Sequence, residues 1–271
     1  MNYQVYDPIP ELAPFVKCFW TLDDDGNSGT SRQRIIPDGC MEMILHYGDL
    51  YKQHFEDSES IIQPRSFIFG QLTRYIEIEP TGISGIVAAR FLPEGLIPFL
   101  NVPVSTLGNK SVDLVDIFGK KGKKLEQEIM QAENNIQRVK LLESFLLLWL
   151  TDPKTIDNIT RACVETIFKS NGQLNVKKVA GKIKINRRSI ERRFVSTIGL
   201  SPKQLSRLVR LQATLKMLEQ KKFRTLTSLA YENGYYDQAH FIRDFKEFTG
   251  VSPKSFYSDN LKLSGLFIAA E

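Results

Sequence analysis

Apolar positions in the first 120 residues come in short runs, some of which alternate with polar positions. They are Met41–Tyr47, Ser66–Gly70, Ile83–Phe91 and the alternating Arg74–Glu79. Short apolar runs and a period of two indicate strands. Turn residues separate the runs, as in Pro37-Asp38-Gly39, where Pro presets φ and Gly tolerates a positive φ. The pattern predicts a sandwich or barrel, with short helices at Glu94–Asn101 and Val112–Phe118.

Residues 124–150 contain no Gly or Pro and carry one apolar stripe at helical spacing. Its members are Leu125, Ile129, Ala132, Ile136, Val139, Leu142 and Leu146. This spacing predicts one or two amphipathic helices, which Thr151-Asp152-Pro153 ends. A second copy of the chain can bury such a stripe, so we expect a homodimer whose contact favours Leu125 to Val139. The alternative is that the stripe packs against the chain's own β-rich part.

Residues 156–258 are predicted to be all-helical and contain an internal repeat with an offset of 51 residues. Arg192-Arg193-Phe194 recurs as Arg243-Asp244-Phe245, and Gly199-Leu200-Ser201-Pro202-Lys203 recurs as Gly250-Val251-Ser252-Pro253-Lys254. Gly favours the end of a helix, and Ser-Pro supplies an N-cap and the first helical residue. Both repeats are therefore predicted to end one helix and start the next in the same way.

Each repeat has the parts of a helix-turn-helix unit. Val176–Ile183 and Leu226–Asn233 are the first helices, followed by tight turns at Lys184-Ile185 and Gly234. Asn186 and Asp237 can cap the second helices, whose apolar positions recur every three or four residues. A short helix, a tight turn and a capped second helix define this motif, and the second helix reads the DNA major groove.

The outward positions of the second helices suit contact with DNA. In the first unit they are Arg187, Arg188, Ser189, Glu191, Arg192 and Arg193, and in the second Gln238, Ala239, His240, Ile242, Arg243 and Lys246. Arginine reads guanine or clamps phosphate, Gln reads adenine, Ala contacts the thymine methyl group, and Glu can accept from cytosine. A solvated basic face is the alternative for one such helix, but the repetition favours DNA.

A helix at Pro202–Gln220 is predicted to join the two units and to touch both through a broad apolar face. Such a spacer can place two recognition helices in successive major grooves, about 34 Å apart.

The charge of the chain is divided between its halves. The net charge is −7 over residues 1–120, +1 over 121–155 and +11 over 156–271, which gives the total of +5. This asymmetry indicates a polyanion-binding module joined to a unit with another task. Three scattered cysteines and the lack of a signal segment or membrane span predict a cytoplasmic protein without a disulfide framework.

The C-terminal half resembles the DNA-binding domain of the AraC/XylS transcriptional regulators. The resemblance covers about residues 170–258 and is carried by Arg188-x-Ile190-x-Arg192-x-Phe194, Gly199-Leu200-Ser201-Pro202, Asn233-Gly234-Tyr235, Asp237-Gln238-Ala239-His240-Phe241-x-Arg243-x-Phe245 and Gly250-Val251-Ser252-Pro253. It implies that Arg188, Glu191 and Arg192 read bases in the first unit, and Gln238, Ala239, His240 and Arg243 in the second. Gly181 and Lys182 depart from the pattern, because good helix formers are usual there.

The N-terminal part is similar to a sensor domain found in a branch of the same family. Phe15-Val16-x-Cys18-Phe19-Trp20, Ile36-Pro37-Asp38-Gly39 and Arg90-Phe91-x-Pro93 carry this similarity, which implies a cupin-like β-domain. The expected class is thus α+β: a β-rich cupin-like sensor domain with helices (1–120), a helical linker or dimerisation segment (121–155) and an all-α domain of two helix-turn-helix units joined by a long helix (156–260).

The expected function is sequence-specific, effector-responsive regulation of transcription, with double-stranded DNA as partner and RNA polymerase as a further candidate. Trp20, Tyr47, Arg90 and Phe91 are candidates for an effector pocket, although core packing is the commoner role for such residues. No cofactor, metal site or catalytic residue is expected, because His46 and His54 lack a nearby third ligand. An enzyme with chemistry in the β-domain and a regulatory DNA-binding tail is the alternative.

Overall fold

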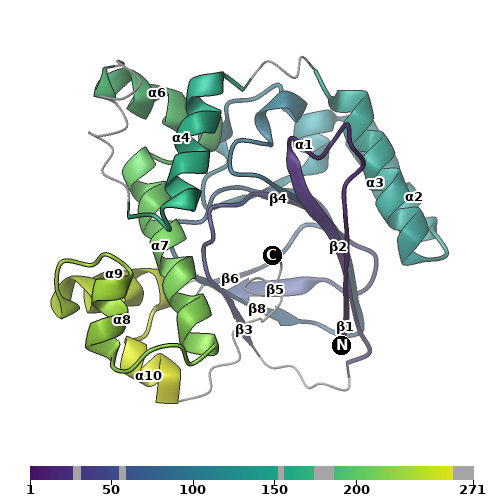
Figure 1. The fold of residues 1–271 in the computed structure, drawn as a ribbon. Coiled ribbons are helices and arrows are strands. Elements are labelled where there is room, and N and C mark those ends of the chain that lie inside the picture. Colours follow the sequence, from purple (N-terminus) through teal and green to yellow (C-terminus); the bar gives the residue numbers. More distant parts are fainter. Residues whose placement is uncertain (27–31, 55–58, 152–155, 174–185, 259–271) are drawn as a thin grey trace.

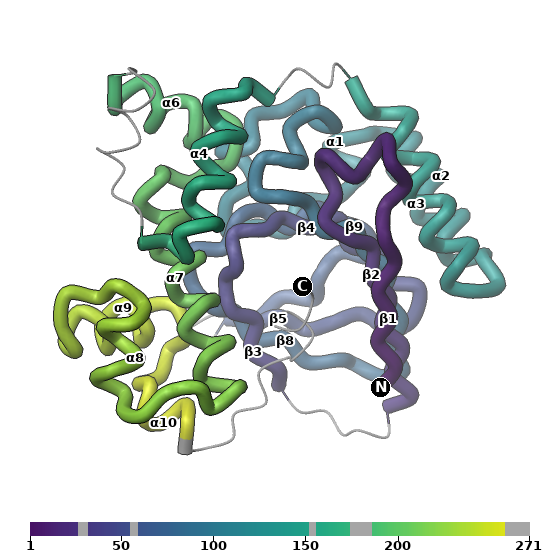
Figure 2. Tube along the Cα trace, in the orientation of Figure 1, coloured from purple at the N-terminus to yellow at the C-terminus, as the bar shows by residue number. Residues whose placement is uncertain are grey.

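A computed structural model describes residues 1–26, 32–54, 59–151, 156–173 and 186–258. The helix expected at Val176–Ile183 and the turn at Lys184-Ile185 lie outside these residues. So do positions 152 and 153 of the expected linker. In Figure 1 the helical half lies to the left of the β-rich half, and α7 (Pro202–Glu219) runs along the boundary. The tube in Figure 2 follows the same path from the N-terminal strands to the C-terminal helices.

The N-terminal half contains two antiparallel sheets. One has the strand order β1-β2-β9-β4-β7-β10 and the other the order β3-β8-β5-β6. The strands are β1 (Asn2–Tyr6), β2 (Val16–Asp24), β3 (Gln33–Ile35), β4 (Glu42–His46), β5 (Tyr51–His54), β6 (Ser60–Ile62), β7 (Ser66–Phe69), β8 (Ile76–Pro80), β9 (Ser84–Phe91) and β10 (Ser111–Asp113). The strands expected in Met41–Tyr47, Ser66–Gly70 and Ile83–Phe91 are confirmed, and the strand expected at Arg74–Glu79 begins two residues later.

The larger sheet buries both of its faces. Alternation along β2 and β9 sends Trp20 and Ala88 toward the smaller sheet, where they meet Tyr51. The intervening residues, such as Phe19 and Phe91, enter a different core beneath the helices. Because both faces of β9 are buried, its residues Ile86 to Ala89 form a continuous apolar run.

Three helices cover the outer face of the larger sheet: α1 (Leu114–Phe118), α2 (Lys120–Gln131) and α3 (Asn135–Trp149). Two short 3-10 turns, η1 (Ile97–Phe99) and η2 (Val104–Thr106), precede them, so the helix expected at Glu94–Asn101 is reduced to one turn. The chain breaks between α2 and α3, where the Asn134 side chain accepts a hydrogen bond from the Gln137 amide and caps α3.

Most of the apolar stripe of residues 124–150 is buried within the same chain. Leu125, Ile129, Leu142 and Leu146 are at most 1% exposed and belong to the core under the sheet. Ile136, by contrast, is 59% exposed. The expectation that Leu125 to Val139 form the dimer contact is therefore corrected, since most of this stripe already packs against the chain's own β-rich part.

A conservative pair of substitutions measures this difference in burial. Ile129→Val should lower the free energy of unfolding by about 0.5–1.5 kcal/mol, because it removes a buried methylene group. Ile136→Val should change it by less than about 0.5 kcal/mol at its exposed site. Chemical denaturation of both variants checks the pair, and equal losses would contradict the assignment of Ile129 to the core.

The C-terminal half is helical in all of its described elements. They are α4 (Asn158–Lys169), α6 (Arg187–Ile198), α7 (Pro202–Glu219), α8 (Leu226–Glu232), α9 (Gln238–Thr249) and α10 (Pro253–Ser258). One apolar core joins these helices around α7, whose Leu205, Leu211 and Leu215 are fully buried. The α+β class and the connecting helix expected at Pro202–Gln220 are thus confirmed.

The segment from Arg34 to Gly39 docks the β-rich half onto the helical half. Ile36 joins the helical core. The Gln212 amide on α7 donates to the Pro37 carbonyl oxygen at 2.8 Å, and an Arg34 guanidinium nitrogen donates to the Thr249 carbonyl oxygen at 2.7 Å. Gly39 has a φ of +85° and leaves room for Leu205, which a Cβ at Gly39 would approach to 2.8 Å. The Pro37-Asp38-Gly39 turn is therefore a contact between the two halves.

None of the described helices combines the length and apolar character needed to cross a bilayer.

Candidate nucleic-acid interface

The two recognition helices, α6 and α9, begin and end alike. The Asn186 side chain accepts from the Arg188 amide at 2.9 Å, and the Asp237 side chain accepts from the His240 amide at 2.7 Å. Both helices end at a left-handed glycine, Gly199 with φ +81° and Gly250 with φ +76°. These are the caps that the repeat predicted, because a short polar side chain and a glycine encode them locally.

Buried aromatic residues fix the rotation of each recognition helix about its axis. Phe194 in α6, and Phe241 and Phe245 in α9, are fully buried in the helical core. The turn before α9 contains Gly234 at φ +72°, and Tyr235 packs beneath it at 5.1 Å from the Phe241 ring. The opposite sides of both helices are therefore turned away from the core, as the spacing predicted.

The outer face of α6 is partly neutralised within the chain. Arg187 pairs with Glu191 at 2.9 Å, four residues along the helix, and Arg193 pairs with Asp157 at the start of α4 at 3.1 Å. Among the described residues, Arg188 and Arg192 have no carboxylate partner. These two arginines, with the neighbouring Ser189, are the part of α6 best prepared to bind an anionic duplex.

The outer face of α9 keeps two cations without a carboxylate partner among the described residues, Arg243 and Lys246. Gln238 accepts a long hydrogen bond of 3.4 Å from Thr227, and Ala239 lies in the open hollow beside Arg243. His240 is 30% exposed, and its Nε2 lies 3.6 Å from the buried Asp244 carboxylate. All six outward positions predicted for the second unit are thus at least partly exposed on α9, including Ile242 at 39%.

The structure also reveals a charged link that the sequence analysis missed. Arg207 on α7 donates to Asp244 at 3.0 and 3.1 Å and to Glu247 at 2.6 and 3.2 Å. Burial alone would lower the pKa of Arg207, but the two carboxylates raise it overall. Asp244 occupies the position in the second repeat that Arg193 occupies in the first. In the second unit the recognition helix α9 supplies the carboxylate and α7 supplies the arginine. In the first unit α6 supplies the arginine, and Asp157 at the start of α4 supplies the carboxylate. The sequence signal for this ion pair is the offset of 51 residues, which aligns the charged Asp244 with the charged Arg193.

The residues expected to line an effector pocket do not form one group. Trp20 donates from Nε1 to Glu42 at 3.1 Å, and Arg90 forms ion pairs with Asp38 and Glu42, so these two meet between the sheets. Phe91 instead faces the core beneath the helices. The Tyr47 hydroxyl donates hydrogen bonds to Asp23 and to Asn135, the first residue of α3. The period of two along β9 separates Phe91 from Arg90.

Burial shifts the pKa of several groups inside the β-rich half. It raises the pKa of Glu42 to about 7, against the opposing effect of the Trp20 hydrogen bond. It lowers the pKa of His46 to about 4, and the His46 ring stacks on Tyr51. His54 instead contacts Glu79 at 3.1 Å. Within the described ranges, no three His, Cys, Asp or Glu side chains gather as a metal site would require.

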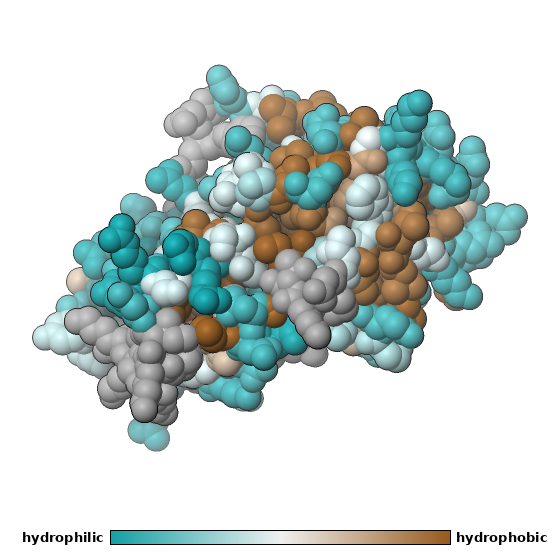
Figure 3. Space-filling model, turned by 90° about the horizontal axis from the view of Figure 1, so that it is seen from above, coloured by the Kyte–Doolittle hydropathy of each residue, from teal (hydrophilic) through white to brown (hydrophobic). Residues whose placement is uncertain are grey.

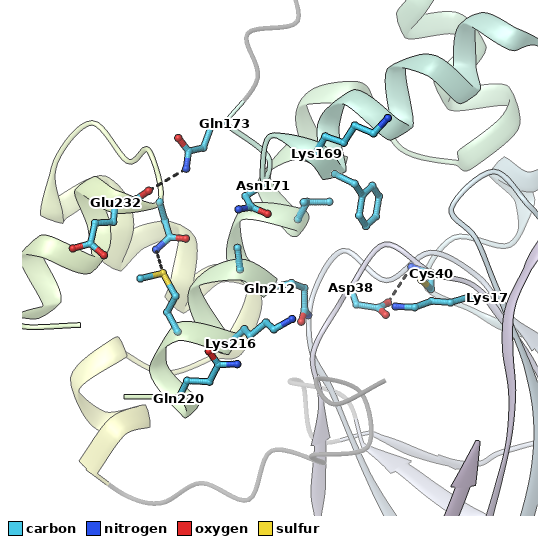
Figure 4. Close-up of a pocket in the computed structure, with 15 residues that line it drawn as sticks. Lys17, Asp38, Cys40, Lys169, Asn171, Gln173, Gln212, Lys216, Gln220 and Glu232 are labelled. Carbon is cyan, nitrogen blue, oxygen red and sulfur yellow. Dashed lines mark hydrogen bonds between the residues drawn. The ribbon is translucent and has the colours of Figure 1, made fainter. Parts of the chain in front are cut away.

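A pocket of about 500 Å³ lies between the two halves (Figure 4). Lys17, Asp38 and Cys40 contribute from the β-rich half, with Lys169 and Lys216 across from them. Apolar side chains also line it, including Phe168, Val209 and Met217. The sequence analysis did not find this pocket, because its walls come from segments far apart in the chain.

The contribution of Arg243 to base reading is testable. Arg243→Ala should weaken binding to a selected specific duplex by about 1–3 kcal/mol and relax the base preference at one position. Fluorescence anisotropy against the selected duplex and single-base variants measures both effects. An equal loss on specific and random duplexes would contradict base reading by Arg243.

Comparisons with known proteins agree with this division of the chain. Residues 179–258 match a family model described as a helix-turn-helix domain, and residues 4–113 match one described as a domain of unknown function. An uncharacterised HTH-type transcriptional regulator of Haemophilus influenzae is 27% identical over 116 residues, which is 43% of this chain and 37% of that protein. The chain therefore matches little more than a third of this relative's length.

Two solved structures have related folds at low similarity. ToxT of Vibrio cholerae is 12% identical with a TM-score of 0.46, and the match covers 95% of this chain and 97% of that one. The C-terminal domain of AraT, a response regulator of Geobacillus stearothermophilus, is 23% identical with a TM-score of 0.36, covering 39% and 88%. The helix-turn-helix match and the curated relative both point to regulators, and the enzyme alternative is set aside.

Proposed function

We propose that the C-terminal half of this chain is an AraC-type helix-turn-helix domain, and that the protein is a sequence-specific transcriptional regulator that binds duplex DNA through α6 and α9. One observation carries the proposal: two recognition helices with equivalent caps each turn cations without carboxylate partners away from the core. These cations are Arg188 and Arg192 in α6, and Arg243 and Lys246 in α9. Cationic side chains on the outer face of a recognition helix are suited to contact base edges and phosphates in the major groove.

Selection from a random duplex pool tests this function directly. The full chain should enrich sequences with two conserved blocks about one helical turn apart, because two linked units read successive major grooves. Arg188→Ala should relax the preference at one position of one block, and Arg243→Ala at one position of the other. A pool that shows no enrichment over its starting composition would overturn sequence-specific recognition.

The pocket between the two halves supports response to a small anionic ligand. Lys17 and Lys216 bring positive charge from the two sides of the pocket, while apolar side chains offer contact to a carbon skeleton. A ligand there touches α7, which carries both helix-turn-helix units. Ligand screening by thermal shift, repeated on Lys17→Gln, tests this site, and a hit that stabilises both proteins equally would place the ligand elsewhere. Trp20 and Arg90, which meet at Glu42 between the sheets, are the rival location for the ligand.

A homodimer remains part of the proposal, with a different surface from the one first expected. Large apolar side chains stay exposed on the covering helices: Val115, Met130, Ile136, Leu147 and Leu148. Figure 3 looks down on the molecule from above and shows hydrophobic brown areas among hydrophilic teal ones. Sedimentation of the full chain at micromolar concentration tests association, and Leu148→Glu should shift it toward monomer. RNA polymerase stays a predicted partner without an assigned surface.

A further inference from the structure

A second cavity, of about 250 Å³, lies between α7 and α9. Lys203, Ser206, Arg207 and Arg210 line it from α7, and they stand at positions i, i+3, i+4 and i+7 of one helix face. His240, Arg243 and Asp244 complete it from α9. The residues of α7 that line the larger pocket between the halves, from Val209 to Gln220, occupy a different face. The two cavities are therefore separate sites on one helix.

The charges around this cavity do not balance. Arg207 is neutralised by Asp244 and Glu247, so this group of three leaves no free positive charge. Arg210 donates to two neutral carbonyl oxygens, of Gly172 at 3.0 Å and of Gly234 at 3.4 Å. In the described part of the chain, Lys203, Arg210 and Arg243 have no carboxylate partner. Three uncompensated cations thus converge on a cavity large enough for one tetrahedral anion.

We propose that this cavity, lined by Lys203, Arg210 and Arg243, is the seat for one phosphate group of the DNA backbone beside the second recognition helix. The inference rests on the proposed function. Lysine and arginine are the side chains that neutralise phosphate. The backbone is favoured over a free anion because His240 and Arg243 also line the open surface next to Ala239. Lys203 and Arg210 hold that phosphate and fix the register of α9 without reading sequence, and Arg243, which also lines the open surface, is left to contact a base edge.

The seat belongs to the second unit alone among the described residues. The repeat positions of His240, Arg243 and Asp244 are Ser189, Arg192 and Arg193. Arg193 pairs with Asp157, and the same offset matches Lys203 with Asp152, which lies outside the described residues. The connecting helix therefore anchors one unit more firmly to the backbone than the other.

The experiment compares two exposed lysines that follow the same Ser-Pro cap in the two repeats. Lys203→Gln and Lys254→Gln remove the same charge at equivalent sequence positions, but only Lys203 lines the cavity. Binding of the full chain to a random-sequence duplex is measured between about 50 and 200 mM salt. Lys203→Gln should reduce the slope of log K against log salt by about 0.9, and Lys254→Gln should leave it unchanged.

A second arm distinguishes backbone phosphate from a free anion. Wild type and Lys203→Gln are titrated with inorganic phosphate and followed by thermal shift. Reduction of the slope in Lys203→Gln alone, with base preference unchanged, supports the seat. Equal reductions of the slope in Lys203→Gln and Lys254→Gln would show that the effect comes from the general charge of the domain, and would overturn the phosphate seat. Stabilisation of the wild type alone by phosphate, with unchanged slopes, would assign the cavity to a free anion. Absence of duplex binding by the wild type would instead refute the proposed function.

Discussion

Affinity of the full chain for duplex DNA is expected to fall roughly 500-fold when salt rises from about 50 to about 200 mM. The estimate follows from about five neutralised phosphates, each of which contributes about −0.9 to the slope of log K against log salt. Five cations of the interface make neither an ion pair nor a side-chain hydrogen bond among the described residues: Arg188, Arg192, Lys203, Arg243 and Lys246. Arg210 is left out because it donates to the carbonyl oxygens of Gly172 and Gly234. Arg187, Arg193 and Arg207 are excluded because each is already paired.

The measurement is an anisotropy titration of a random-sequence duplex at four salt concentrations. Counterion release makes the plot linear, so the slope counts the phosphates directly. Arg187→Gln serves as a control, because its charge is compensated by Glu191 and its loss should change the slope by less than the loss of Arg192. Binding that is no stronger at 50 mM than at 200 mM salt would refute the electrostatic argument.

Features encoded by neighbouring residues were predictable from the sequence. The caps at Asn186 and Asp237 and the left-handed Gly199 and Gly250 depend on residues within one turn of each other. A repeat offset of 51 residues then located the second unit from the first. The outward faces followed because buried phenylalanines at helical spacing leave the other sides to solvent.

Features that depend on distant segments were not predictable in the same way. Helical spacing shows that Ile129 lies on an apolar stripe, but it does not show whether a sheet or a second chain covers it. The break before Asn134 also turns Ile136 out to 59% exposure, which a single continuous stripe would not allow. Likewise, the link from Arg207 to Asp244 crosses 37 residues.

The Pro37-Asp38-Gly39 sequence predicts a turn, but its contacts in the fold could not be predicted from these three residues. Its turn chemistry was evident, and Gly39 does adopt a φ of +85°. Its function in the fold comes from partners far along the chain, since Pro37 accepts from Gln212 and Asp38 pairs with Arg90. The same three-residue segment thus touches the connecting helix on one side and the interior of the β-rich half on the other.

Replacement of Asp38 by Asn is expected to lower the free energy of unfolding by about 3–5 kcal/mol. Arg90 is only 2% exposed, and burial lowers its pKa because the charged guanidinium has lost its water. Asp38 supplies the compensating charge from the turn. Glu42 lies 3.4 Å from Arg90, but burial raises the pKa of Glu42 to about 7, so it offers only part of a negative charge near neutral pH. Removal of Asp38 therefore leaves a buried cation poorly compensated.

The change of Asp38 to Asn removes the charge of the side chain but preserves the shape of the turn. The Asp38 oxygen that accepts from the Cys40 amide at 2.9 Å has a counterpart in the Asn side chain, so the turn keeps this hydrogen bond. Arg90→Met combined with Asp38→Asn removes both charges, and it should recover much of the lost stability because no unpaired ion remains. Chemical denaturation of the single and double variants measures the coupling. A loss no greater than that of Asp7→Asn, at an exposed aspartate, would show that Asp38 does not neutralise Arg90.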